Sequence, residues 1–408
     1  MITNSLKFMN QYNDNGVIFM IRKLASQLRA MAVFRNLLSD NVISKLLALY
    51  ECPSAVVCGE FASALYEHTD NLTDYILSAL SESQNDYMLR HARMQEIPDV
   101  INSAAHAELK LLEFASRVTP MEVKASMSYD GYFPHWNTRN DVDFIEFYAN
   151  RMAELHTKGY GMYAKYYSFM YRDGAITPVK TPDPQKLSEL SGYELERNKV
   201  ADNTKALIDG KPAANALLYG DAGTGKSSTV KAVVNEFKDK GLRLIELKKS
   251  QLHEMPLIIE EIADNPLKFI LFIDDLSFAS DDDDFGALKA VLEGSASAKT
   301  SNIVIYATSN RRHLVKEKFS DRDGDDIHAR DSREELTSLS ERFGLKVTFT
   351  KPSKELYLMI VKSLADRNGL DIDENTLFTK AEAYALRRSG RSGRAAKQFI
   401  ELMMSGQL

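Results

Sequence analysis

The sequence predicts an α/β protein in which a three-layer α/β/α domain with a five-stranded parallel sheet follows an all-α domain and precedes a small helical domain. The chain has 408 residues, which is too many for one hydrophobic core. Its first part has apolar residues at helical spacing, and its middle part has short apolar runs separated by helical or loop-like segments. Strands that alternate with helices indicate a parallel sheet covered on both faces.

The N-terminal part, residues 1–180, is predicted to be a helical domain. Apolar residues recur at steps of three and four from Ile18 to Leu38, as expected for an amphipathic helix. The same pattern covers residues 61–80, 100–118 and 142–171. The last of these helices is rich in tyrosine, and aromatic side chains near Lys165 and Arg172 are able to stack on nucleic-acid bases. Packing within the helical domain is the simpler interpretation of these tyrosines.

The middle part, residues 181–351, carries the predicted sheet. A stretch with three prolines, from Gly174 to Gln185, is predicted to be an extended linker in front of it. The five predicted strands are residues 216–219, 242–247, 269–273, 303–307 and 345–349. The chain then returns to helical patterns at residues 355–368, 379–388 and 394–404. Residues 352–408 are therefore predicted to be a separate helical domain.

Hydropathy, cysteine content and net charge argue against several classes of protein. No apolar run reaches the roughly 18 residues that a membrane helix needs, so no membrane partner is expected. Two cysteines do not make a disulfide framework, which favours a reducing cytoplasm. A net charge of −6 argues against a protein that coats nucleic acid. The basic cluster from Arg387 to Lys397 keeps local binding to nucleic-acid phosphates open.

A phosphate-binding loop is predicted between the first strand and the helix that follows it. The segment from Gly220 to Ser227 fits the pattern G-x-x-x-x-G-K-[ST] at every position. Its glycines let the backbone curl so that successive N–H groups point at phosphate oxygens. Lys226 is expected to reach the β- and γ-phosphates of ATP, and Ser227 to hold Mg²⁺. The expected nucleotide-binding residues are Gly220, Asp221, Ala222, Gly223, Thr224, Gly225, Lys226, Ser227 and Ser228.

A pair of carboxylates ends the strand at residues 269–273. A buried strand that delivers an acid at its carboxyl end provides the kind of ligand that Mg²⁺ and its water molecules require. Asp274 is therefore the expected metal carboxylate. Asp275 is expected to polarise the attacking water as a general base.

The order of these segments resembles the AAA+ superfamily of P-loop ATPases. One strand and one helix separate the phosphate-loop helix from the strand that ends at Asp274, and Tyr306-Ala-Thr-Ser-Asn310 ends the next strand. The resemblance implies that Asn310 helps to position the attacking water. Gly192-Tyr193-Glu194 resembles the segment that packs near the adenine.

Two arginines are assigned roles by the same resemblance. Leu339-Ser-Glu-Arg342-Phe-Gly is similar to the segment with an arginine finger, which implies that Arg342 reaches the γ-phosphate of a neighbouring subunit and that the protein is a homo-oligomer. Ser392-Gly-Arg394-Ala-Ala is similar to the second sensor, in which an arginine of a helical lid touches the γ-phosphate. Arg330 and Arg333 are alternatives for the finger, and Arg391 is an alternative for the sensor. The expected catalytic residues are Lys226, Asp274, Asp275, Asn310, Arg342 and Arg394, and the expected metal ligands are Ser227 and Asp274.

Four longer segments resemble one bacterial family more closely, the predicted AAA+ ATPases catalogued as domain of unknown function number 815. These segments begin at Asp274, Leu288, Ala307 and Leu336, and the similarity extends from about Leu187 to Phe399. The family name assigns no biological task, so the resemblance implies an activity and no pathway.

The sequence favours an ATPase that switches, loads or remodels a macromolecular partner recruited by the helical domain. Most AAA+ hydrolases have glutamate where this chain has Asp275. Aspartate is one methylene shorter, so hydrolysis is expected to be slow. The alternative is a scaffold or switch that binds nucleotide with negligible turnover. A small-molecule kinase is disfavoured by the combination of Asn310, Arg342 and Arg394. The identity of the partner, nucleic acid included, stays open.

Overall fold

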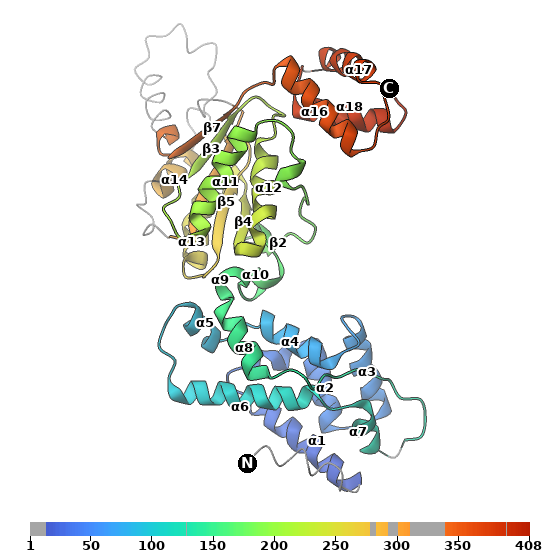
Figure 1. Cartoon of the computed structure of the whole chain (residues 1–408). Helices are drawn as coiled ribbons and strands as arrows, with labels where there is room; N and C mark the ends of the chain where they lie inside the picture. The colour runs from blue at the N-terminus through green and yellow to red at the C-terminus, as the bar shows by residue number, and fades with distance from the viewer. Residues whose placement is uncertain (1–13, 128, 278–282, 293–300, 311–338, 389) are drawn as a thin grey trace. The chain divides into compact units, whose positions relative to one another are not determined.

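The chain divides into two units, residues 1–165 and 166–408. In the computed structural model, the described residues are 14–127, 129–277, 283–292, 301–310, 339–388 and 390–408. Each unit has its own hydrophobic core, so each is described separately. Figure 1 traces both units in chain order.

The first unit is helical, as predicted. Its α-helices are α1 (Asp14–Arg29), α2 (Asn41–Glu51), α3 (Ala55–Tyr66), α4 (Leu72–Glu82), α5 (Asp86–Ala92), α6 (Asp99–Ser116), α7 (Pro120–Ala125), α8 (Phe144–Ala153), α9 (Leu155–Lys158) and α10 (Met162–Lys165). A short 3₁₀ helix, η2 (Arg35–Ser39), follows α1. The core contains Trp136, Tyr50 and Phe34, which are at most 1% exposed.

The helix predicted from Ile18 to Leu38 is interrupted, and a buried carboxylate explains the break. Glu108 of α6 accepts the backbone N–H groups of Ala32 at 2.7 Å, Val33 at 3.0 Å and Phe34 at 2.9 Å. These N–H groups therefore have a side-chain partner instead of the carbonyl groups of a continuing helix. The prediction of one helix over residues 61–80 was wrong for a similar reason, because Asn71 caps a new helix at Leu72.

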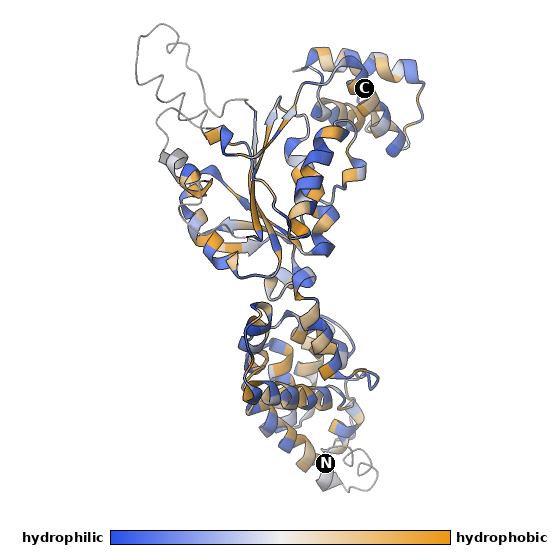
Figure 2. Cartoon of the chain, turned by 60° about the vertical axis from the view of Figure 1, so that its left-hand side comes forward, coloured by the Kyte–Doolittle hydropathy of each residue, from blue (hydrophilic) through white to orange (hydrophobic). Residues whose placement is uncertain are grey.

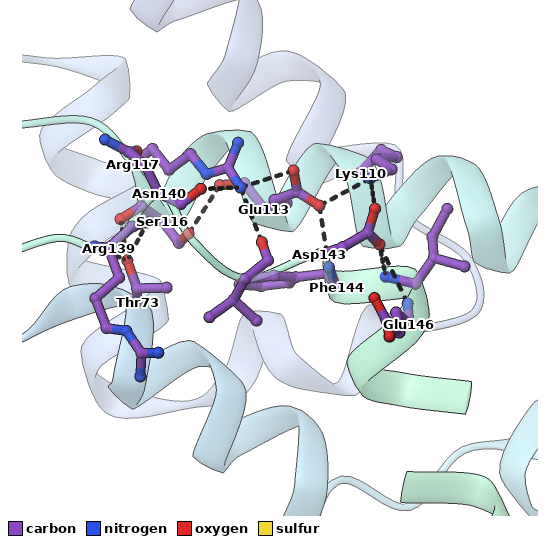
Figure 3. A network of polar contacts seen from close by, with 12 residues as sticks. Thr73, Lys110, Glu113, Ser116, Arg117, Arg139, Asn140, Asp143, Phe144 and Glu146 are labelled. Carbon is purple, nitrogen blue, oxygen red and sulfur yellow. Dashed lines mark hydrogen bonds and ion pairs between the residues drawn. The ribbon is translucent and has the colours of Figure 1, made fainter. Parts of the chain in front are cut away.

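A second buried carboxylate fixes the start of α8. Glu113 of α6 accepts hydrogen bonds from the backbone N–H of Phe144 and from Lys110, both at 3.0 Å, and pairs with Arg117 at 3.0 Å (Figure 3). Asp143 caps α8 by accepting the N–H of Ile145 at 2.8 Å. The surroundings of Glu113 are therefore those of a structural ion pair.

The second unit is built on a seven-stranded sheet in the order β2-β1-β4-β5-β6-β3-β7. The strands are β1 (Ser168–Arg172), β2 (Ala175–Pro178), β3 (Ala216–Gly220), β4 (Leu242–Leu247), β5 (Lys268–Ile273), β6 (Ile303–Ser309) and β7 (Leu345–Phe349). All five predicted strands are present, and they are adjacent and parallel in the sheet. The predicted α/β domain with five parallel strands is therefore confirmed.

Two strands at one edge of the sheet correct the prediction. Residues 168–172 were expected to end a helix, but they form β1, which pairs in parallel with β4. The expected linker contains β2, which pairs antiparallel with β1. Pro178 ends this outermost strand, where a missing backbone N–H costs no ladder bond. Residues 168–178 thus belong to the sheet and not to the helical unit.

Helices cover both faces of the sheet. Alternate residues such as Leu218, Ile270 and Tyr306 form a core with α11 (Glu194–Ile208) and α12 (Lys226–Phe237). The helices α13 (Met255–Ala263) and α14 (Asp283–Leu292) lie on the other side (Figure 1). Figure 2 shows the hydrophobic residues concentrated along the strands between these layers. Short 3₁₀ helices are η3 (Leu187–Glu189), η4 (Lys238–Lys240) and η5 (Lys249–Glu254).

Three helices end the chain, close to the positions predicted for them. They are α16 (Lys354–Arg367), α17 (Glu374–Arg387) and α18 (Gly393–Met404). Tyr357, Ala381 and Phe399, one from each helix, are fully buried in contact with the core of the α/β layers. No helix among the described residues has the length and hydropathy to span a membrane.

Candidate functional site

A cavity of about 650 Å³ opens at the carboxyl ends of β3, β5 and β6. The loop between β3 and α12 forms one wall, and the first turn of α18 forms another. Asp274, Asp275 and Asn310 from the ends of β5 and β6 line it as well. The strand order places these side chains together, because the carboxyl ends of parallel strands meet at one edge of the sheet.

The loop from Gly220 to Gly225 has the curled backbone that its sequence predicts. Gly220 has φ of +133°, and a Cβ atom there would lie 2.0 Å from the carbonyl oxygen of Phe349. Gly225 has φ of +95° and precedes the first residue of α12. The loop is also held from β7, because Asp221 donates its N–H to Phe349 O at 3.0 Å and accepts the N–H of Lys351 at 2.8 Å. Glycine is therefore required at position 220 by both conformation and space.

Lys226 is buried beneath this loop, with 6% of its surface exposed. Its ammonium group donates to Gly220 O at 2.9 Å, to Asp221 O at 2.8 Å and to Asn310 Oδ1 at 2.9 Å. Burial lowers the pKa of Lys226 from its ordinary value, while nearby Asp221 and Asp275 oppose that shift. A lysine held at the base of a phosphate loop is placed to donate to phosphate oxygens.

Ser227 and Asp274 lie in direct contact. The Ser227 hydroxyl donates to Asp274 Oδ1 at 2.5 Å, and both residues line the cavity. A hydroxyl oxygen and a carboxylate oxygen are hard ligands of the kind that Mg²⁺ binds, usually alongside water and phosphate oxygens. Within the described residues, no group of three or more acidic, histidine or cysteine side chains offers a complete cage. The pair therefore fits a cation that the phosphates also hold.

Asn310 connects Lys226 with Asp275. Its Nδ2 donates to Asp275 Oδ1 at 2.7 Å, and its Oδ1 accepts from Lys226. The orientation of this amide is determined by its neighbours, because an ammonium only donates and a carboxylate only accepts. Asp275 has φ of +54°, an uncommon conformation for a residue other than glycine. The strand tips thus hold two of the predicted site residues in one polar chain with the phosphate loop.

One end of the cavity is more apolar than the phosphate loop. Leu190, Tyr193, Ile360 and Leu364 line it, and the last two belong to α16. A Cβ at Gly192, whose φ is +74°, would lie 2.8 Å from a methyl group of Leu356, so the chain passes close against α16. Burial raises the pKa of Tyr193 to about 12. Apolar and aromatic side chains of this kind suit a flat heterocyclic base.

Arg394 and Arg391, the two candidates for the sensor arginine, have different surroundings. Arg394 lines the cavity and donates its backbone N–H to Gly223 O at 3.1 Å. Ser392 caps α18 by accepting the N–H of Ala395 at 3.1 Å, as predicted. Arg391 pairs with Glu382 through Nε at 2.8 Å and Nη2 at 2.6 Å. The geometry therefore favours Arg394 for contact with a ligand.

Arg342 does not line this cavity. It lies in a turn just before β7, and its side chain is half-buried. The role of Arg342 as an arginine finger stays a prediction. The alternatives Arg330 and Arg333 fall outside the described residues.

Thr308 is a site residue that the sequence did not predict. It lines the cavity, is 1% exposed, and forms hydrogen bonds with both Asp274 and Asp275. Thr308 lies in β6 two residues before Asn310, which directly follows the strand. The alternation of side chains along an extended chain therefore directs both to the same side, and this spacing is the signal that the sequence offered.

Comparisons with known proteins give one family and two curated relatives. The family described as "Protein of unknown function (DUF815)" matches residues 163–407. Two curated relatives are both named replication factor C large subunit. The protein from Staphylothermus marinus is 30% identical over 118 residues, which is 27% of this chain and 27% of that protein. The protein from Thermofilum pendens is 29% identical over 136 residues, or 31% of this chain and 32% of that protein. The chain thus matches less than a third of each relative.

Among solved structures, two mutants of RuvB from Thermotoga maritima are similar to 55% of this chain. They are 15% and 16% identical, cover 67% and 68% of the RuvB chains, and both superpose with a TM-score of 0.38.

Replacing Gly220 tests the geometry of the loop. We expect Gly220→Ala to lose triphosphate binding, because the added methyl group meets the Phe349 carbonyl. Gly210→Ala is the matched control, since Gly210 also has positive φ (+70°) but nothing within 4 Å of the added atom. The control should cost only the conformational strain, about 1–2 kcal/mol. Thermal unfolding with and without ATP measures both effects, and equal behaviour of the two variants would contradict the prediction.

Proposed function

The chain belongs to the DUF815 family, and we propose that it is an AAA+ ATPase that binds Mg-ATP and hydrolyses it slowly. One observation carries the proposal, which is the convergence of Lys226, Ser227 and Asp274 on one cavity under a curled glycine loop. An ammonium, a hydroxyl and a carboxylate in this order suit a triphosphate and its magnesium ion. The apolar end of the same cavity suits the adenine base.

In the proposed reaction, a water molecule attacks the γ-phosphorus and the bond to the bridging oxygen of ADP breaks. Bound Mg²⁺ would neutralise charge on the phosphates. Lys226 donates to phosphate oxygens, and Arg394 lies at the cavity wall where it is able to approach the γ-phosphate. Asp275 accepts the proton of the water, which Asn310 helps to position. Because an aspartate carboxylate reaches less far than a glutamate carboxylate, the expected hydrolysis is slow.

We further propose that the active form is a homo-oligomer. Arg342 lies outside the cavity of its own chain, so a role in catalysis requires a neighbouring copy. The curated relatives are named as subunits, which supports an assembly. The helical unit would recruit the macromolecule that ATP binding switches, loads or remodels. The relatives carry the name replication factor, so DNA is the first partner to test.

A nucleotide-dependent scaffold is the second candidate function. It is favoured by one observation, the 2.7 Å hydrogen bond from Asn310 to Asp275, which engages one oxygen of the carboxylate that hydrolysis needs. In that case, ATP fixes the arrangement of subunits and turnover is incidental.

Removing the Lys226 ammonium tests nucleotide binding. We expect Lys226→Ala to weaken Mg-ATP binding by about 100-fold or more, because a buried charged donor to the phosphates is lost. Lys205→Ala, on the exposed surface of α11, is the control and should bind normally. Isothermal titration calorimetry measures both affinities. Undiminished binding by Lys226→Ala would refute the proposed site.

Arg342 tests the shared active site. We expect Arg342→Ala to bind ATP normally and to lose turnover by a factor on the order of 10³, since a finger arginine stabilises charge only in the transition state. The specific activity of the wild type should rise with protein concentration, and that of the variant should not. Arg367→Ala, an exposed arginine on α16, is the control. Wild-type activity that is independent of concentration would argue against catalysis between subunits.

Asp275 separates hydrolysis from the scaffold. We expect Asp275→Asn to keep ATP binding and to lower phosphate release by about 10²–10⁴-fold, the contribution of a general base. Phosphate release is followed over hours in the wild type, in this variant and in the surface control Asp366→Asn. Identical background rates in the wild type and Asp275→Asn would favour the scaffold.

A further inference from the structure

We propose that Thr308 is a positioning residue of the nucleotide site, which fixes Asp274 and Asp275 together through one hydroxyl group. The inference rests on the proposed function, because it concerns how the site holds the magnesium carboxylate and the general base. It adds a residue that lies neither in the phosphate loop nor among the expected catalytic groups.

The hydroxyl of Thr308 has a donor contact and an acceptor contact with the two aspartates. It donates to Asp274 Oδ1 at 2.5 Å. It accepts the backbone N–H of Asp275 at 2.9 Å. A hydroxyl group has one hydrogen to donate and lone pairs to accept, so both contacts form at once. One atom of β6 therefore connects the side chain of the first acid to the backbone of the second.

The backbone of Thr308 adds a third contact to the same turn. Its carbonyl oxygen accepts the N–H of Leu276 at 2.7 Å. Asp275 lies between these contacts with φ of +54°, a conformation that needs support from its surroundings. The hydrogen bonds to Asp275 and Leu276 hold the turn on both sides. Thr308 thus fixes the direction in which the Asp275 carboxylate leaves the sheet.

The burial of Thr308 indicates that its hydroxyl is present for the hydrogen bonds that it forms. The residue is 1% exposed, and its neighbours Tyr306 and Ala307 on the strand are fully buried. Valine has the same branched shape and would fill this space without a polar group, as buried strands usually do. A buried hydroxyl is favourable only when it is hydrogen-bonded, and here both partners belong to the acidic pair.

The contact with Asp274 also selects one of its two oxygens. Ser227 and Thr308 both donate to Oδ1, each at 2.5 Å. The second oxygen, Oδ2, is then the one left to accept from the water molecules of a cation. Groups that orient a metal-binding side chain in this way affect metal affinity or activity by about 10- to 100-fold.

The test compares two substitutions at Thr308 with a buried threonine elsewhere in the same unit. Thr308→Val keeps the shape and removes the hydroxyl, and Thr308→Ser keeps the hydroxyl. Thr204→Val is the control, because Thr204 is fully buried and its hydroxyl bonds to Val200 O and Tyr306, away from the acidic pair. Two quantities are measured, the affinity for ATP without Mg²⁺ and the Mg²⁺ concentration at half-maximal rise in the melting temperature of the ATP-saturated protein.

We expect Thr308→Val to bind ATP without Mg²⁺ as the wild type does and to need about 10- to 100-fold more Mg²⁺. Its kcat should fall by a similar factor. Thr308→Ser should keep the wild-type Mg²⁺ dependence, and so should Thr204→Val. If Thr308→Val does not fold, Thr308→Ala takes its place.

An unchanged Mg²⁺ dependence in the variants without the hydroxyl would overturn the proposal, and so would a serine variant as impaired as the valine variant. Failure of the proposed function gives a different result, because the wild type itself would then show no rise in melting temperature with ATP.

Discussion

The site depends on the burial of one charge, the ammonium group of Lys226. A charged group that is buried away from water needs hydrogen-bond partners to replace the water. The ammonium group of Lys226 donates to two carbonyl oxygens of the glycine loop and to the amide oxygen of Asn310. The first two contacts hold the loop in its curled conformation, and the third connects Lys226 with the residue that follows β6. Since the same amide donates to Asp275, the position of the buried charge also determines where the general base candidate lies. The parallel order of the strands makes this possible, because β6 lies between β3 and β5 and all three end at the cavity.

The same loop also determines where the last helices lie. Gly223 has φ of +77°, and a Cβ there would lie 3.2 Å from atoms of both Ser392 and Arg394. The first turn of α18 approaches so closely that the Arg394 N–H donates to the Gly223 carbonyl. Gly223 therefore has two roles. Its conformation directs N–H groups of the loop toward a ligand, and its lack of a side chain leaves room for the first turn of α18. Arg394 lies in the first turn of α18, so a movement of α18 changes the place of the Arg394 side chain in the cavity.

How far the sequence predicts this protein varies with the kind of signal. The strands at 242–247 and 345–349 were predicted to the residue, since each is a short apolar run with clear ends. Residues 168–172 were not predicted as a strand. A five-residue run that contains Phe169 and Tyr171 fits the end of an aromatic helix as well as a strand, and it is the pairing with β4 that makes it a strand. The phosphate loop was predictable because phosphate binding requires its glycines, lysine and serine at a fixed spacing in the sequence. The role of Thr308 was not predictable, because its hydroxyl bonds to a residue at the end of a neighbouring strand that lies more than 30 residues away in sequence.

In the proposed site, one amide connects the phosphate loop with the candidate general base. Asn310 accepts from Lys226 and donates to Asp275, so its orientation is determined only while both partners are in place. Phosphate oxygens are stronger acceptors for an ammonium than an amide oxygen is. A ligand that draws the ammonium away removes one of the two contacts that hold the amide, and the contact with Asp275 then has to hold it alone. The carboxylate that would activate water is therefore sensitive to occupancy of the phosphate loop, although the two lie on different strands. The proposed site is therefore expected to respond to ATP binding even when hydrolysis is slow, so the same residues suit either proposed function.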